Sequence, residues 1–439
     1  MHGKHYKKRN FSGKAIIILI VIIAASIISA AIAYTYAVKN NPQVPGQSDT
    51  PTVPSEGGNT AENKHQPTAE EEADKLVSGM SLEEKIGQMV IIGFKGYDAD
   101  ANTASLIEDK HIGGIILFER NIENDKQLVD LNNQLKSLNK DNKLPLFISA
   151  DHEGGRIARL PARATDFPSN LTIGKKNSSD LSYQVGQVLG SEMAAYGFNL
   201  DFAPVADIFS NPKNTVIGDR SFGKDPDTVS GLAVATMKGI KSQGVVPVVK
   251  HFPGHGDTAV DSHVDLPVSY KSMKQLKSFE LLPFESAIDQ GADMMMVAHI
   301  KLPEIDKTGL PASLSHAVIT GLLRDDLGFK GVVITDDLEM GAIAKHYGTG
   351  DAAVKAVEAG ADMVLVCHTY ESQTEAIDAI AKAVKNGQIS EERIDESVKH
   401  IVMLKQKYKL SDKPVNLSGV EETVGSEKHQ SIADKARVK

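Results

Sequence analysis

Eight short apolar segments recur between residues 88 and 366, and amphipathic segments with a helical period separate them. Each is short enough to be a strand buried on both faces of a sheet. This alternation predicts an α/β fold, a single (β/α)₈ TIM-type barrel. A doubly wound open sheet is the alternative, because a count of strands does not prove closure. The expected strands are Gln88–Gly93, Gly114–Phe118, Leu146–Ala150, Leu200–Val205, Val245–Val249, Met294–Ala298, Val332–Thr335 and Met363–Val366.

Capping signals mark the helices between these strands. Ser81 with Glu84 has the form of a capping box, and a glycine follows four of the expected helices, where it can end a helix in the left-handed conformation. We expect one globular domain over residues 70–410, followed by a polar C-terminal tail, residues 411–439, too short for a second domain. The clearest helices are expected at Leu181–Tyr196, Thr228–Ser242, Met273–Asp289, Ala352–Ala359, Glu371–Val384 and Glu391–Tyr408.

The first 69 residues differ in composition from the rest. A basic head, residues 1–14, precedes an uncharged run from Ala15 to Ala33 that would span roughly 30 Å as a helix, about the thickness of a bilayer core. We expect a transmembrane signal-anchor over residues 15–38 with the head in the cytoplasm. Residues 39–69 are expected to be a disordered linker that holds the domain outside the cell. The alternative is a cleaved signal peptide and a secreted domain, because Ala31-Ile32-Ala33 resembles a cleavage site.

Charge and cysteine content exclude two classes of function. The net charge is −9, and the basic head contributes +5, so the remainder carries −14. A surface of that charge does not attract nucleic acid. Cys367 is the only cysteine, which excludes an intrachain disulfide and a cysteine-rich zinc centre.

Charged and polar side chains follow five of the expected strands. In a (β/α)₈ barrel the C-terminal strand ends meet at one face, where catalytic residues lie. Any one of these residues could be a solvated loop charge or a helix N-cap, as Asp337 could be, but five charged strand ends favour a shared site. The residues are Asp151-His152-Glu153-Gly154-Gly155-Arg156, Asp207 with Gly218-Asp219-Arg220-Ser221-Phe222-Gly223, Lys250-His251, His299, and Thr335-Asp336-Asp337-Leu338-Glu339-Met340.

The densest group of titratable residues lies between Lys250 and His263. Two acid/base groups that face each other across a site suit glycoside hydrolysis. Asp336 is then the candidate nucleophile, and His263 is the candidate proton donor, with Asp261 to orient and charge its imidazole. The side chains expected to bind sugar hydroxyls are Asp151, Arg220, Lys250 and His251.

A metal-dependent barrel hydrolase is the alternative from a different class. A metal barrel usually takes its ligands from several strands, whereas this cluster lies mostly on one loop. The residues alone do not identify a sugar as the substrate. The metal ligands would be His251, His255, His263, Asp257 and Asp261.

A resemblance to a known family covers roughly Ala73 to Leu410. The string Lys250-His251-Phe252-Pro253-Gly254-His255-Gly256, followed after four residues by Asp261-Ser262-His263, resembles the signature of the β-N-acetylglucosaminidases of glycoside hydrolase family 3. The likeness extends to the Asp151–Arg156 string with Arg159-Leu160, to Gly218–Phe222, and to Thr335–Met340.

The resemblance implies a general acid/base at His263 and Asp261 and a nucleophile at Asp336. It implies retention of configuration through a covalent glycosyl-enzyme, with no metal or organic cofactor. The sugar removed would be a terminal β-linked N-acetylglucosamine, drawn from peptidoglycan or muropeptide fragments, and no obligate protein partner is implied. The alternatives are a β-glucosidase, a β-xylosidase or a glycoside phosphorylase of the same fold, and a non-enzymatic cell-wall binding module. Substrate contacts are implied at Asp151, Arg159, Arg220, Lys250 and His251.

Overall fold

The computed structural model describes residues 67–258 and 266–437. The expected anchor at 15–38 and nearly all of the expected linker lie outside these residues, as do Asp261 and His263. Within the part of the chain that is described, no helix combines the length and the apolar character needed to cross a bilayer.

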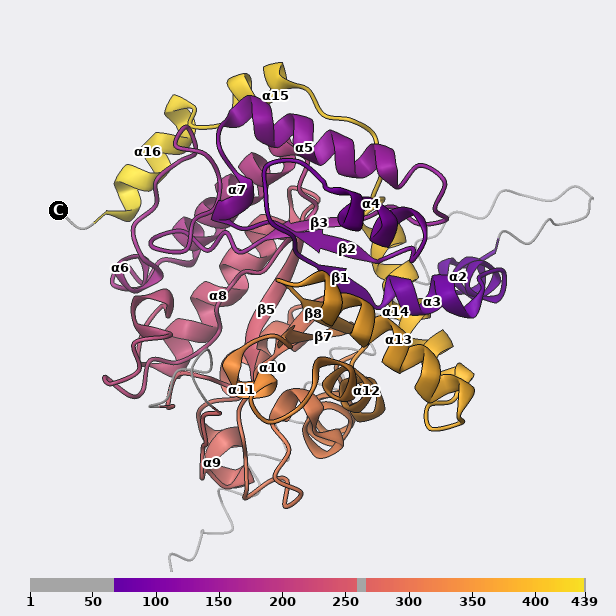
Figure 1. The fold of residues 1–439 in the computed structure, drawn as a ribbon. Helices are drawn as coiled ribbons and strands as arrows, with labels where there is room; N and C mark the ends of the chain where they lie inside the picture. The colour runs from indigo at the N-terminus through magenta and orange to yellow at the C-terminus, as the bar shows by residue number, and fades with distance from the viewer. Residues whose placement is uncertain (1–66, 259–265, 438–439) are drawn as a thin grey trace, which may run out of the picture. The chain divides into compact units, whose positions relative to one another are not determined.

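Eight parallel strands form a closed barrel in the order β1 to β8 (Figure 1). Closure comes from β1 and β8, where Val90, Ile91 and Ile92 pair with Val364, Leu365 and Val366. The expected barrel is therefore confirmed, and the open-sheet alternative is wrong. The strands are β1 Val90–Ile92, β2 Gly114–Ile116, β3 Phe147–Ala150, β4 Leu200–Asp201, β5 Val246–Phe252, β6 Met294–Val297, β7 Val332–Asp337 and β8 Met363–Val366.

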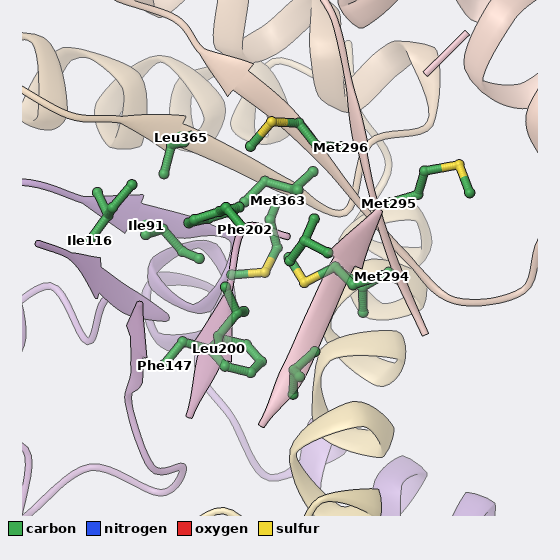
Figure 2. Close-up of a cluster of buried hydrophobic side chains, with 14 of the residues drawn as sticks. Ile91, Ile116, Phe147, Leu200, Phe202, Met294, Met295, Met296, Met363 and Leu365 are labelled. Atoms are coloured by element: carbon green, nitrogen blue, oxygen red, sulfur yellow. The ribbon is translucent and has the colours of Figure 1, made fainter. Parts of the chain in front are cut away.

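Apolar side chains on both faces of these strands make up the core. The β-strand residues are buried almost without exception, which removes enough apolar surface to stabilise the fold by about 1.5–3 kcal/mol for each large side chain. Figure 2 shows part of this core, in which four methionines lie beside aromatic and branched side chains. Met296 and Leu365 also line the cavity at the mouth of the barrel, so the top of this core is the floor of the site.

Helices surround the barrel, and glycines permit the closest approach between two of them. A Cβ atom on Gly186 of α7 would lie 2.2 Å from the Thr236 carbonyl oxygen of α8. Only glycine therefore fits at this crossing. The main helices around the strands are α2 Ala69–Ser78, α3 Leu82–Gln88, α4 Ala101–Glu108, α5 Asp125–Leu138, α7 Ser179–Tyr196, α8 Pro226–Lys241, α10 Leu282–Asp289, α12 Thr349–Ala359, α13 Tyr370–Lys385 and α14 Glu391–Lys407.

Three features differ from the expectations. The expected helix Met273–Asp289 is two helices, α9 Met273–Ser278 and α10, because Phe279 leaves the helical region and Pro283 starts the second. Strand β5 continues through Lys250 and His251 to Phe252, so these two residues belong to a strand and not to a loop. The polar tail contains α15 Leu417–Thr423 and α16 Glu427–Ala436, which pack on α7.

Candidate active site

A cavity of about 370 Å³ opens at the C-terminal ends of the strands. Six of the eight expected site residues line it: Asp151, Arg159, Arg220, Lys250, His251 and Asp336. Asp261 and His263 lie outside the described residues. The other residues of the cavity wall are Ile116, Phe118, Glu153, Ile157, Val216, His255, Met296, Asp337, Glu339, Met340, Gly341, Leu365, Cys367 and His368.

A buried cluster of ion pairs forms one wall of the cavity. Lys250 comes from β5, and its Nζ lies 2.5 Å from Asp151 Oδ1 and 2.7 Å from Glu153 Oε1. Arg220 binds Glu153 through two parallel contacts, Nη2 to Oε1 at 2.6 Å and Nε to Oε2 at 2.9 Å. Bidentate pairing of this kind fixes both groups in orientation as well as in position.

This cluster keeps its members charged although it is buried. Burial alone would raise the pKa of Glu153, but Arg220 and Lys250 hold it far below its usual range. Burial alone would lower the pKa of Lys250, but Asp151 and Glu153 raise it above its usual value. The pKa of Arg220 also rises, because Glu153 outweighs the effect of burial. The cavity wall therefore presents fixed cationic donors to any hydroxyl group that enters.

His251 is held in one tautomer by its neighbours. Its Nδ1 lies 2.6 Å from Asp207 Oδ2, and its Nε2 lies 3.4 Å from Arg220 Nη2. Because a guanidinium nitrogen only donates, Nε2 accepts and Nδ1 donates to Asp207. Burial alone would raise the pKa of Asp207, but His251 and His255 lower it. The ring is thus neutral and fixed against the cavity.

The loop after β5 is fastened to the loop after β4. The backbone N–H of His255 donates to Asp207 Oδ1 at 2.6 Å, and Asn214 Nδ2 donates to the His255 carbonyl at 2.7 Å. Gly256 lies so close to Ile208 that a Cβ atom would be 1.8 Å from its carbonyl oxygen. Burial lowers the pKa of His255 to about 4. His255 therefore shapes this loop as a neutral side chain.

The described members of the expected metal set are engaged in other contacts. His251 binds Asp207, His255 Nδ1 lies 2.8 Å from Thr258 Oγ1, and Asp257 pairs with Lys271 at 3.3 Å. Among residues 67–258 and 266–437, no group of three or more His, Cys, Asp and Glu side chains has the arrangement of a metal site.

Asp336 stands at the end of β7, half-buried in the cavity wall. Its Oδ1 accepts the backbone N–H of Asp337 at 2.9 Å. Asp337 points away to β8, where its Oδ1 accepts from the Cys367 N–H at 3.1 Å and its Oδ2 lies 3.1 Å from His368 Nε2. Asp337 does not cap the next helix, α11 Gly341–Ala344, whose N-cap is Met340.

His299, at the end of β6, supports the same strand end from below. Its Nε2 donates to the Asp337 carbonyl at 2.9 Å, which leaves Nδ1 to accept from Ser313 Oγ at 2.6 Å. The backbone that carries Asp336 is therefore held from both neighbouring strands, which limits the freedom of its carboxylate.

Arg159 reaches the cavity from the loop after β3. Its Nε is buried and has no hydrogen-bond partner among the described residues. A buried guanidinium nitrogen without an acceptor is costly, so a ligand hydroxyl or carbonyl oxygen at this point would be stabilised.

Two residues of the site were not among the expected contacts, Glu153 and Asp207. Both were recognised only as charges at strand ends. A signal was available for Glu153, because Arg220 and Lys250 are expected at one site and need anionic partners if they are buried. Asp207 has a similar role for His251, but no spacing in the sequence connects the two.

The chain matches known proteins over most of its length. The family model described as "Glycosyl hydrolase family 3 N terminal domain" matches residues 81–404. Beta-hexosaminidase A of Pseudoalteromonas piscicida is 32% identical over 392 residues, which are 80% of this chain and 65% of that protein. The chain thus spans slightly less than two thirds of that relative.

Solved structures give the same likeness. A glycoside hydrolase family 3 beta-N-acetylglucosaminidase from Paenibacillus sp. str. FPU-7 is 42% identical, with a TM-score of 0.77 over 81% of this chain and 68% of that one. A beta-glucoside phosphorylase, BglX, bound to 2FGlc, is 25% identical, with a TM-score of 0.76 over 84% of this chain and 66% of that one.

Proposed function

Because this chain belongs to glycosyl hydrolase family 3, we propose that it is a retaining exo-β-N-acetylglucosaminidase. The observation that carries the proposal is the cavity in which the Asp336 carboxylate shares a wall with Arg220, Lys250 and His251. A carboxylate beside a set of fixed hydrogen-bond donors suits attack on the anomeric carbon of a bound sugar.

In the proposed reaction, Asp336 forms a bond to the anomeric carbon as the glycosidic C–O bond breaks. The departing oxygen takes a proton from His263, which Asp261 orients. Water then gives its proton back to His263 and attacks the same carbon, which releases the sugar with retained configuration and frees the Asp336 carboxylate. Lys250, Arg220 and Asp151 hold the sugar hydroxyls through both steps.

The assignment of His263 and Asp261 rests on the residues that flank them. Before the 259–265 segment, Thr258 is tied to His255 and Asn214 at the cavity. After it, Ser269 N–H donates to the Lys301 carbonyl, and Lys301 follows β6 at the same end of the barrel. Both flanks of the segment are therefore held at the mouth of the barrel, which supports the proposal that its histidine acts there.

N-acetylglucosamine is the proposed sugar because the relatives named above include a beta-hexosaminidase and a beta-N-acetylglucosaminidase. We propose peptidoglycan or its muropeptide fragments as the source, with residues 15–38 as a membrane anchor and the barrel outside the cell. The apolar run and the linker composition of the first 69 residues support this location.

The test compares aryl β-N-acetylglucosaminide, β-glucoside and β-xyloside with purified residues 66–439, which form one compact unit. We expect turnover of the first to exceed that of the other two. A preference for the glucoside would contradict the sugar assignment and leave the catalytic roles intact. Because one similar structure is a phosphorylase, the assay is run with and without phosphate. Release of a sugar 1-phosphate would show that phosphate, not water, is the acceptor.

A further inference from the structure

The loop that carries Arg159 depends on contacts made far from the cavity. It joins β3 to α6 Asn170–Gly174, and the Arg159 N–H donates to Nδ1 of the buried His152 at 3.2 Å. Burial lowers the pKa of His152 to about 4, so this nitrogen remains an acceptor at neutral pH. The far half of the loop, from Pro161 to Pro168, has its own anchor at Thr165.

That anchor is Glu192 of α7, which is fully buried. Its two oxygens accept the backbone N–H and the hydroxyl of Thr165, at 2.8 and 2.6 Å. The same carboxylate accepts the Gly425 N–H at 2.9 Å and lies 2.8 Å from His429 Nδ1. Burial alone would raise the pKa of Glu192, but hydrogen bonds from His429, Thr165 and Gly425 lower it. One charged group therefore joins the site loop to the C-terminal helices.

Two further contacts connect the same segments. Gly425 lies against Arg163 so closely that a Cβ atom would be 2.2 Å from the Arg163 carbonyl oxygen. Arg437 Nη2 donates to the Asp166 carbonyl at 2.7 Å and to its carboxylate at 2.9 Å. Figure 1 shows α15 and α16 beside the helices of the barrel, and both pack on α7. The contacts thus run along the loop from residue 163 to residue 166.

We propose that α15 and α16 are a positioning element for substrate binding. Acting through Glu192, they fix the loop that presents Arg159 to the cavity. They lie beyond residue 404, where the family match ends, so this is a feature of the chain outside the matched barrel. Glu192 and His429 are positioning residues, since neither lines the cavity. The inference rests on the proposed function for its kinetic consequence only.

The experiment removes the His429 contact in the full-length protein. His429→Ala deletes the donor to Glu192, and His429→Asn returns an amide nitrogen close to the place of Nδ1. His400→Ala is the matched control, because His400 Nδ1 lies 3.1 Å from the fully buried Asp362 Oδ1, just ahead of β8 at the opposite end of the barrel. Gly425→Ala is a second, steric disturbance that pushes directly on Arg163. Each variant is assayed for KM and kcat on aryl β-N-acetylglucosaminide and for backbone hydrogen exchange of residues 155–167.

We expect His429→Ala and Gly425→Ala to raise KM about tenfold, equivalent to about 1.4 kcal/mol, with a smaller change in kcat. Exchange of residues 155–167 should become faster in both, stay near the wild-type rate in His429→Asn, and be unchanged in His400→Ala. Equal KM values and equal loop exchange for His429→Ala, Gly425→Ala and His400→Ala would overturn the proposal. If the wild-type protein does not cleave the N-acetylglucosaminide, the proposed function fails, and the exchange measurement still tests the positioning element on its own.

Discussion

Glu153 is the residue whose loss should disturb the site most for the smallest change in shape. Glu153→Gln keeps the size of the side chain and removes the charge that faces Arg220 and Lys250. Oε1 accepts from both cations, at 2.6 and 2.7 Å, and Oε2 accepts from Arg220 Nε at 2.9 Å. Whichever way the amide is turned, its NH₂ group faces a donor. Two buried cations would then share Asp151 as their remaining close anion.

The cost follows from the burial of the cluster. Lys250 and Glu153 are almost completely buried, and removal of one partner of a buried ion pair costs about 3–5 kcal/mol. A folded unit from Gln66 to Lys439 has an unfolding entropy of about 0.8 kcal/mol/K at about 2.1 cal/mol/K per residue. The midpoint of thermal unfolding should therefore fall by about 4–6 °C. We also expect kcat/KM to fall on the order of 100-fold, because the donors to the sugar lose their fixed positions.

Asp219→Asn is the matched control, since Asp219 and Arg156 form an ion pair of 2.8 Å on neighbouring loops with both side chains 45% exposed. Its effect should be about 0–1 kcal/mol. Thermal unfolding by calorimetry and kinetics on the aryl glycoside measure both variants. If Glu153→Gln unfolds at the same temperature as Asp219→Asn and keeps its activity, the buried cluster does not have the energetic role given to it here.

The remaining predictions concern acid, catalysis, metals and location. The folded-state pKa of Glu153 is depressed, so its stabilising effect is full above its usual value of 4.5 and is lost as the pH falls below that value; the stability gap between wild type and Glu153→Gln should narrow below pH 4.5, and a constant gap in unfolding titrations would contradict this. His263→Ala should lose about 10²–10⁴-fold on natural sugar–sugar bonds but less on activated aryl glycosides, with Asp261→Ala milder, whereas Asp336→Ala should be severely impaired on both; equal losses for His263→Ala on the two substrates would exclude it as the acid. Activity should survive exhaustive chelation, and loss that added zinc restores would favour the metal-hydrolase alternative. Protease added to intact cells without an outer barrier should release an active domain by cutting within residues 40–68, and a protected domain would contradict the external location.

The barrel could be predicted from the sequence because parallel strands buried on both faces are continuous apolar runs. Segments such as Val332–Thr335 and Met363–Val366 therefore stand out without any knowledge of their neighbours. The helix split at Phe279 could not be predicted in the same way. Its cause is tertiary, since the buried Glu280 forms an ion pair with Lys271 across the break, and apolar periodicity does not report such a pair.

The site was predictable where residues sit in strand-end strings, as Asp336, Lys250 and His251 do. The supporting anions were harder to find, because Glu153 is 67 residues from Arg220 and 97 residues from Lys250. The C-terminal helices illustrate the same limit. Their apolar side chains, such as Val420 and Ile432, are few and widely spaced, so residues 411–439 read as a polar tail although the described part of it packs on α7.

The pairing of β1 with β8 also sets when the domain can finish folding during synthesis. Val90 must wait for Val364, 274 residues later, and at about 5–20 residues per second the ribosome needs roughly 14–55 s to make that interval. Until then β1 is an open edge, able to pair with any exposed strand. A message cut short before residue 364 would yield a sheet that cannot close on itself, and such a product should be found in aggregates or in the hands of chaperones rather than as a smaller active enzyme.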